Sequence, residues 1–172
     1  MIRTYFNTMG AKKILCLVLA ALVLACVTYN IAAKANEPVN ELKCWVLCQP
    51  RDYINVRSLP STHGNPVGFL DPGDEITIST DAKNGFFPII SPSFDGEAFI
   101  SARYVSTEEP EWKGGQEYCV VSNARVAARK WLDGPRLSWL VNGTVVRVFY
   151  YTPTWSVTNR GFIQSQYLEE YY

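Results

Sequence analysis

Few residues in this 172-residue chain have the chemistry of a catalytic nucleophile or base. His63 is the single histidine, and it lies in Ser61-Thr-His-Gly64, a composition typical of a loop. A cysteine nucleophile would need His63 beside Cys48 or Cys119, with a third group to orient the ring. We expect an exposed loop histidine instead, and a cysteine hydrolase is kept only as a third hypothesis.

Metal-binding and cofactor-binding patterns are equally sparse. Cys44 and Cys48 with one histidine do not provide the ligands of a zinc site. Asp71, Asp74 and Glu75 are too few ligands at loop spacing for calcium, and no phosphate-binding glycine loop occurs. The sequence therefore predicts no catalytic residue, no metal and no cofactor.

Aromatic residues at the edges of expected loops are better candidates for ligand binding. Tyr and Trp are typical anchors of interaction sites, because they provide a large contact area at a small entropic cost. The candidates are Tyr53, Phe86, Phe87, Trp131 and Trp155. Trp131 stands between Lys130 and Asp133, where a large ring has little reason to be buried.

The first 35 residues have the features of an export signal. Residues 14–33 carry no charge, Lys12 and Lys13 precede them, and Ala33-Lys-Ala35 ends the segment. A signal peptide cleaved after Ala35 is expected, which places the mature chain in the periplasm, outside the cell or in the cell wall. Two alternatives stay open: an uncleaved membrane anchor over 14–33, and lipid attachment at Cys26.

Three cysteines follow this segment: Cys44, Cys48 and Cys119. An odd number allows one disulfide and one free thiol within the chain. In a straight strand, Cys44 and Cys48 would lie about 13 Å apart at roughly 3.3 Å per residue. Bridging them needs a turn, or else Cys119 pairs with one of them, so the pairing stays open.

An internal repeat indicates the architecture that positions these residues. Three blocks recur in the same order: Ile54-Asn-Val-Arg57 and Val126-Ala-Ala-Arg129, Phe69-Leu-Asp-Pro-Gly73 and Trp139-Leu-Val-Asn-Gly143, Ala98-Phe-Ile-Ser-Ala-Arg-Tyr-Val105 and Gly161-Phe-Ile-Gln-Ser-Gln-Tyr-Leu168. Apolar residues alternate after each glycine, which is the pattern of half-buried strands. We therefore predict an all-β protein made of two tandem small barrels behind an N-terminal apolar helix.

The repeat also limits what individual residues do. Arg57 and Arg129 recur at one position, so we expect a structural role in which the guanidinium bonds nearby carbonyls. For Trp155 the alternative to ligand binding is a core position that matches Phe86 or Phe87. The expected boundaries are 1–35 for the leader, 43–106 for the first barrel, 107–117 for a linker and 118–170 for the second barrel.

The first copy resembles the bacterial SH3-like family. The resemblance rests on Ile54-Asn-Val-Arg-Ser-Leu-Pro-Ser61, Val67-Gly-Phe-Leu70, Pro72-Gly-Asp74 and Phe99-Ile-Ser-Ala-Arg-Tyr-Val105. It departs at Leu59 and Ala98, where that family usually has glycine. The second copy is more divergent, because Lys130-Trp-Leu-Asp-Gly-Pro135 replaces the usual R-x-G-P-S run.

The resemblance implies a non-catalytic module that binds peptidoglycan stem peptides or cross-bridges. The expected function is therefore an exported protein that recognises cell-wall peptidoglycan. The alternative is an adaptor between envelope proteins, or an inhibitor of a secreted enzyme or assembly. Contact with the membrane is expected only through residues 14–33 or a lipidated Cys26.

Charge is distributed unevenly behind the leader. Residues 36–111 carry a formal net charge of −7 and residues 112–172 carry +3. A nucleic-acid partner is not expected on these numbers. The acidic half would attract amine-bearing stem peptides and the basic half anionic partners, or the two halves dock on each other.

Overall fold

The computed structural model describes residues 40–94 and 96–172. The leader, with its alternatives of cleavage, anchoring and lipidation, lies outside the described residues, as does the apolar N-terminal helix. In the part of the chain that is described, no helix is long and apolar enough to cross a membrane.

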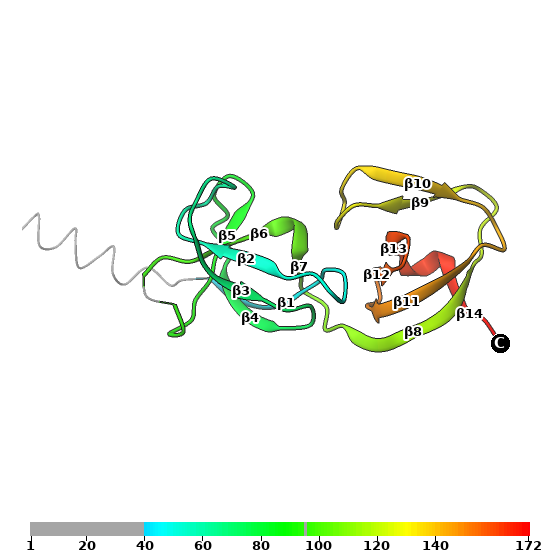
Figure 1. Cartoon of the computed structure of the whole chain (residues 1–172), viewed down its shortest axis with the longest axis horizontal. Coiled ribbons are helices and arrows are strands. Elements are labelled where there is room, and N and C mark those ends of the chain that lie inside the picture. The colour runs from blue at the N-terminus through cyan, green and yellow to red at the C-terminus, as the bar shows by residue number, and fades with distance from the viewer. Residues whose placement is uncertain (1–39, 95) are drawn as a thin grey trace, which may run out of the picture. The chain divides into compact units, whose positions relative to one another are not determined.

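Antiparallel strands dominate the described residues, which confirms the prediction of an all-β protein (Figure 1). The N-terminal half contains β1 (Glu41–Val46), β2 (Ile54–Arg57), β3 (Pro66–Leu70), β4 (Glu75–Ser79), β5 (Phe86–Pro88), β6 (Phe99–Ser101), the 3-10 helix η1 (Ala102–Tyr104) and β7 (Val105–Ser106). The C-terminal half contains β8 (Glu111–Val120), β9 (Val126–Arg129), β10 (Arg136–Leu140), β11 (Val145–Tyr151), β12 (Trp155–Thr158), β13 (Gly161–Gln164), the 3-10 helix η2 (Ser165–Tyr167) and β14 (Leu168–Glu170).

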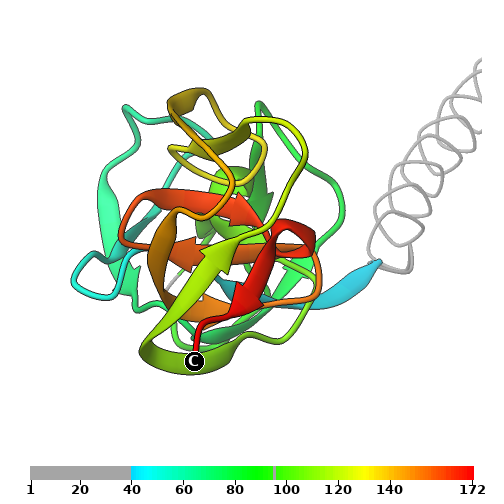
Figure 2. The same ribbon diagram turned by 90° about the vertical axis from the view of Figure 1, so that its right-hand side faces the viewer.

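The strands of the two halves follow the same spatial order. The C-terminal half is one sheet, in the order β10-β9-β13-β12-β11-β8-β14, and it curls around its own core (Figure 2). The N-terminal half has two sheets, β3-β2-β6-β5 and β4-β1-β7, with an isolated bridge between Ile78 and Ile89 that connects β4 to the end of β5. Equivalent strands therefore have equivalent neighbours: the order β3-β2-β6-β5-β4-β1-β7 in the N-terminal half corresponds to β10-β9-β13-β12-β11-β8-β14 in the C-terminal half.

Equivalent glycines form the turn before β4 and the turn before β11. Gly73 has a φ of 93° and Gly143 a φ of 81°, a region that glycine enters without steric cost. The N–H of Gly73 donates to the carbonyl of Val46 at 2.8 Å, and that of Gly143 donates to Val120 at 2.8 Å. Each turn thus ties the start of one strand to the end of another.

The segment expected to be a linker is in large part a strand. β8 begins at Glu111 and pairs with β11, so only residues 107–110 connect the two halves. Gly114 and Gly115 have positive φ where the register with β11 shifts, between Val148 and Tyr150. The two glycines therefore mark a β-bulge inside a long strand. The amino-acid composition of this segment does not by itself distinguish a bulge from a linker.

Each half has a core built from alternating strand residues. Ile76 and Ile78 face the N-terminal core, and Val146 and Val148 face the C-terminal core, as the sequence predicts. A third cluster combines Leu47 of the N-terminal half with buried residues of the C-terminal half, namely Trp155, Val157 and Phe162. The two halves therefore share buried apolar surface, and we call this cluster the junction core.

The junction core supplies a stability test with a matched control. Leu47 and Val121 occupy equivalent positions, because their N–H groups donate to the carbonyls of Tyr104 and Tyr167, respectively. Leu47 is fully buried, whereas Val121 is 42% exposed. We expect Leu47→Ala to lower the free energy of unfolding by about 2–5 kcal/mol, and Val121→Ala by about 1 kcal/mol or less. Urea unfolding of the full chain measures both values, and equal losses would contradict a shared core.

Candidate ligand-binding groove

Two adjoining hollows lie over the outer face of β2. Their volumes are about 230 Å³ and about 530 Å³, and both are lined by Tyr53, Ile54, Asn55 and Tyr104. We call the pair the β2 groove. The larger hollow reaches Lys130 and Phe162, so the C-terminal half contributes to the groove.

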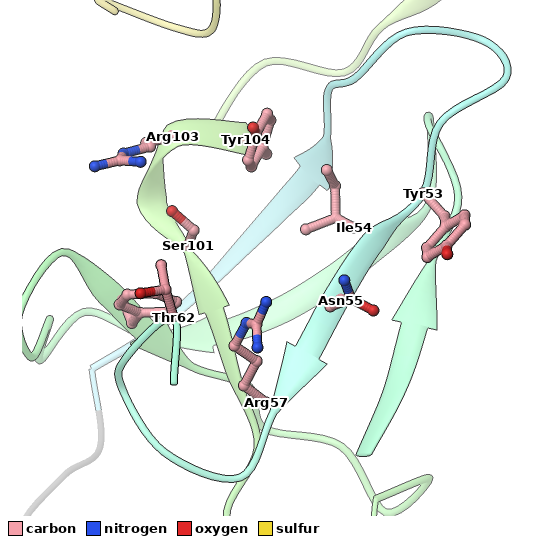
Figure 3. A pocket seen from close by; sticks show the side chains of 9 residues that line it. Tyr53, Ile54, Asn55, Arg57, Thr62, Ser101, Arg103 and Tyr104 are labelled. Carbon is pink, nitrogen blue, oxygen red and sulfur yellow. The ribbon is translucent and has the colours of Figure 1, made fainter. Parts of the chain in front are cut away.

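The period of β2 decides which side chains the groove receives. Ile54 and Val56 are buried, whereas Asn55 and Arg57 are half-buried on the opposite face. Figure 3 shows Asn55 and Arg57 on β2 and Ser101 on the neighbouring β6, all lining the smaller hollow. The amide, the guanidinium and the hydroxyl provide hydrogen-bond donors of different geometry within one site.

Arg57 also fixes the loop that borders the groove. Its Nη1 donates to the carbonyl of Gly64 at 2.8 Å, and Nη1 of Arg129 donates to Gly134 at 2.8 Å. A hydrogen bond from the guanidinium to a nearby backbone carbonyl is the structural role that the sequence predicts for both arginines. Arg57 lines the smaller hollow as well, so the same side chain supports the loop and contributes charge to the groove.

The groove is locally cationic. Arg51, Arg57, Arg103 and Lys130 line it together with one acidic residue, Asp52. None of these four cations belongs to an ion pair among the described residues, where the pairs are Lys43–Glu75 and Lys113–Glu111. The net negative charge of residues 36–111 therefore does not describe this surface, which favours anionic groups over the amine-bearing groups expected from the sequence.

The three aromatic candidates of the N-terminal half differ in accessibility. Tyr53 is 60% exposed, lines both hollows, and makes an edge contact with Phe69 at a centroid distance of 5.9 Å. Phe86 is buried and forms part of the wall of the smaller hollow. Phe87 packs against the N-terminal core. Tyr53 is thus the accessible ring of the three.

The two tryptophan candidates of the C-terminal half lie at the junction. Trp155 is 7% exposed within the junction core, so the alternative core interpretation describes it correctly. It matches Phe86, because Trp155 pairs with Gln164 as Phe86 pairs with Ser101. The N-terminal half covers the Trp155 ring through Leu47.

Trp131 is half-buried, although its loop composition predicts exposure. The guanidinium of Arg103 lies 4.4 Å from the ring centre, a cation–π contact between the halves. The next residue, Leu132, donates its N–H to the carbonyl of Arg103 at 3.3 Å. Trp131 therefore helps to position Arg103 at the groove.

Sequence reasoning did not name most of the polar residues of the groove as candidates, among them Asn55 and Ser101. The alternation in Ile54-Asn-Val-Arg57 was a signal that Asn55 faces outward beside Arg57. Arg51, Arg103 and Lys130 carry no local signal, because they meet only after loops from both halves come together.

Cys44, Cys48 and Cys119 are free thiols among the described residues, and the two buried ones are not activated as nucleophiles. Burial, with added effects of Asp52, Asp71 and Asp74, raises the pKa of Cys48 to about 12. Burial also raises the pKa of Cys44. A nucleophilic cysteine needs the opposite shift. His63 is exposed, and its Nδ1 lies 3.4 Å from Ser61 Oγ.

No group of three His, Cys, Asp or Glu side chains that could hold a metal ion occurs within residues 40–94 and 96–172. The structure brings Tyr53 and Phe86 to the same hollow, whereas Trp155 lies in the junction core. Hydrogen-bond donors and cations without an ion-pair partner among the described residues define the chemistry of the β2 groove.

Comparisons with known proteins give limited similarity. No family model and no curated protein match the chain. Among solved structures, NlpC2 from Trichomonas vaginalis aligns with 78% of this chain, and the alignment covers 50% of the NlpC2 chain. The sequence identity is 11% and the TM-score is 0.34. NlpC1 from the same organism aligns with 76% of this chain, and the alignment covers 46% of the NlpC1 chain, with a sequence identity of 12% and a TM-score of 0.32. The chain thus spans about half the length of these proteins, and similarity this low carries no argument about function.

Proposed function

We propose that the chain is an exported, non-catalytic protein that binds cell-wall peptidoglycan through a stem peptide or cross-bridge. The β2 groove carries this proposal, because an accessible ring, an amide and four unpaired cations line one surface. Peptide stems present carboxylates and amides, which arginine and asparagine bind with defined geometry. In this proposal Tyr53 packs against the aliphatic part of the peptide.

The proposed architecture is a tandem of two SH3-like barrels, over 43–106 and 118–170 with β8 extending the second. Three features support a duplication: the common strand order, the equivalent glycine turns, and the matching bonds of Arg57 and Arg129. A leader over residues 1–35 would deliver the protein to the envelope, either cleaved, anchored by 14–33 or lipidated at Cys26.

A second candidate function is an envelope adaptor or inhibitor that binds another protein. The edge strands β3 and β10 favour it, because they present large exposed apolar side chains, namely Val67, Phe69, Leu137 and Trp139. Exposed apolar edge strands are common sites of strand addition by a partner. This function would use the sheet edges and leave the groove free.

Co-sedimentation of the full chain with insoluble peptidoglycan tests the main proposal. We expect saturable pelleting that Tyr53→Ala weakens by about fivefold to tenfold, the range typical of an interface anchor. Tyr171→Ala is the matched control, because Tyr171 is 53% exposed and lies outside the groove. The buffer contains detergent, because the full chain includes the apolar residues 14–33.

The result can go against the proposal in two ways. Absence of pelleting at moderate salt would reject peptidoglycan as the ligand and favour the adaptor. Equal binding by the Tyr53→Ala and Tyr171→Ala variants would reject the β2 groove as the site.

The non-catalytic part of the proposal predicts the order of thiol alkylation. At pH 7.5, iodoacetamide should modify the half-exposed Cys119 and leave Cys44 and Cys48 unmodified in the folded chain. Burial blocks both thiols, and a pKa of about 12 keeps Cys48 protonated. Peptide mass spectrometry measures the modification at each site, with denatured protein as the control in which Cys44, Cys48 and Cys119 all react. Preferential modification of native Cys48 would reopen the hypothesis of a cysteine hydrolase.

A further inference from the structure

A separate hollow of about 440 Å³ lies where the loop after β1 meets β11. The N-terminal half contributes Gln49, Pro50 and Arg51, and the C-terminal half contributes Arg147, Phe149 and Asn159. We call it the junction hollow. It shares Gln49 and Arg51 with the β2 groove but none of the aromatic residues of that groove.

Hydrogen bonds hold the polar residues of the junction hollow in place. Gln49 Nε2 donates to the carbonyl of Thr158 at 3.1 Å, which fixes the loop on the C-terminal half. Arg147 N–H donates to Asn159 Oδ1 at 2.9 Å, and Asn159 N–H donates to the Arg147 carbonyl at 3.0 Å. These bonds leave Gln49 Oε1 and Asn159 Nδ2 available to a ligand, as one acceptor and one donor.

An exposed tryptophan contacts Phe149, which lines this hollow, and belongs to none of the buried clusters of the described residues. Trp112 is 56% exposed and stacks on Phe149, with ring centroids 6.4 Å apart and an interplanar angle of 23°. Its centroid also lies 4.8 Å from that of Tyr150, whose hydroxyl donates to the carbonyl of Pro72 at 2.9 Å. The two aromatic contacts therefore hold the ring, while more than half of its surface stays in solvent.

The charge of the hollow is unbalanced. Arg51 and Arg147 come from different halves, and neither belongs to an ion pair among the described residues. The hollow itself is lined by no acidic side chain. Two arginines without a carboxylate partner favour an anionic ligand, because the guanidinium matches a carboxylate in two parallel hydrogen bonds.

We propose that the junction hollow binds a saccharide that carries a carboxylate. The apolar face of a sugar ring packs on Trp112, the amides of Gln49 and Asn159 bond its hydroxyls, and the two arginines bind its carboxylate. The inference rests on the proposed function, and it adds a glycan subsite to the peptide site of the β2 groove.

Titration calorimetry of the full chain with three soluble probes tests the inference. The first probe is a peptide-free peptidoglycan tetrasaccharide, whose muramic acid residues carry free lactyl carboxylates. The second is a chitin tetrasaccharide, which is neutral, and the third is a free stem peptide. We expect the carboxylated glycan to bind about tenfold more tightly than chitin, with an affinity that falls as salt rises.

Paired variants locate the binding. Trp112→Ala and Arg147→Gln should each weaken binding of the carboxylated glycan by about fivefold to tenfold and leave binding of the stem peptide unchanged. The controls are Trp139→Ala and Arg125→Gln, because Trp139 is 48% exposed on β10 and both residues lie outside the hollow. Trp112→Phe keeps the aromatic stack if the alanine variant fails to fold, and it should retain most of the affinity.

The outcomes separate this inference from the proposed function. Binding of the stem peptide without the carboxylated glycan would overturn the inference and leave the β2 groove intact. Binding of the glycan alone would support the hollow and reject the groove. Equal effects of Trp112→Ala and Trp139→Ala, or no preference for the carboxylated glycan over chitin, would also overturn the inference.

Discussion

The burial of Leu47 between the two halves is the constraint on which the binding surfaces depend. Leu47 is the first residue after β1, and its side chain enters the junction core beside Trp155, Val157 and Phe162. Its position brings the loop of residues 47–53 onto the C-terminal half. That loop contributes Arg51 to both the β2 groove and the junction hollow, and Tyr53 to the groove. The equivalent loop after β8 starts at the exposed Val121 and has no second half to cover it.

The shared core also explains why a protein of this size keeps its halves together. A unit of roughly 60 residues buries a small core and is only marginally stable. A buried tryptophan removes about 150–250 Å² from water, which corresponds to about 4–6 kcal/mol of transfer free energy. Leu47 contributes part of this burial for Trp155, and residues of its own half, among them Val157 and Phe162, contribute the rest, so each half adds to the stability of the other.

The sequence predicts the local structure well and the junction poorly. The alternation of Ile76 with Ile78 and of Val146 with Val148, and the positions of Gly73 and Gly143, follow from strand period and turn geometry. These features depend on neighbours in the chain. The core position of Trp155 and the contact of Trp131 with Arg103 depend on the other half, so a loop composition misassigns them. The same limit hid Trp112, because a bulged strand with two glycines has the composition of a linker. Arg147 lies on a predicted strand, but it meets Arg51 only where the two halves come together.

The contacts between the halves explain why the cationic side chains remain available for a ligand. The opposite formal charges of the two halves suit a docking held by ion pairs, yet neither ion pair of the described residues crosses the junction: Lys43–Glu75 lies in the N-terminal half and Lys113–Glu111 in the C-terminal half. Across the junction, Tyr150 and Gln49 donate to backbone carbonyls, and Leu47 packs on apolar side chains. These contacts, together with the cation–π contact of Arg103 with Trp131, hold the halves without an ion pair to Arg51, Lys130 or Arg147. Because none of these three cations forms an ion pair with a carboxylate of the described residues, an anionic ligand at either site would meet cations that are free to bind it.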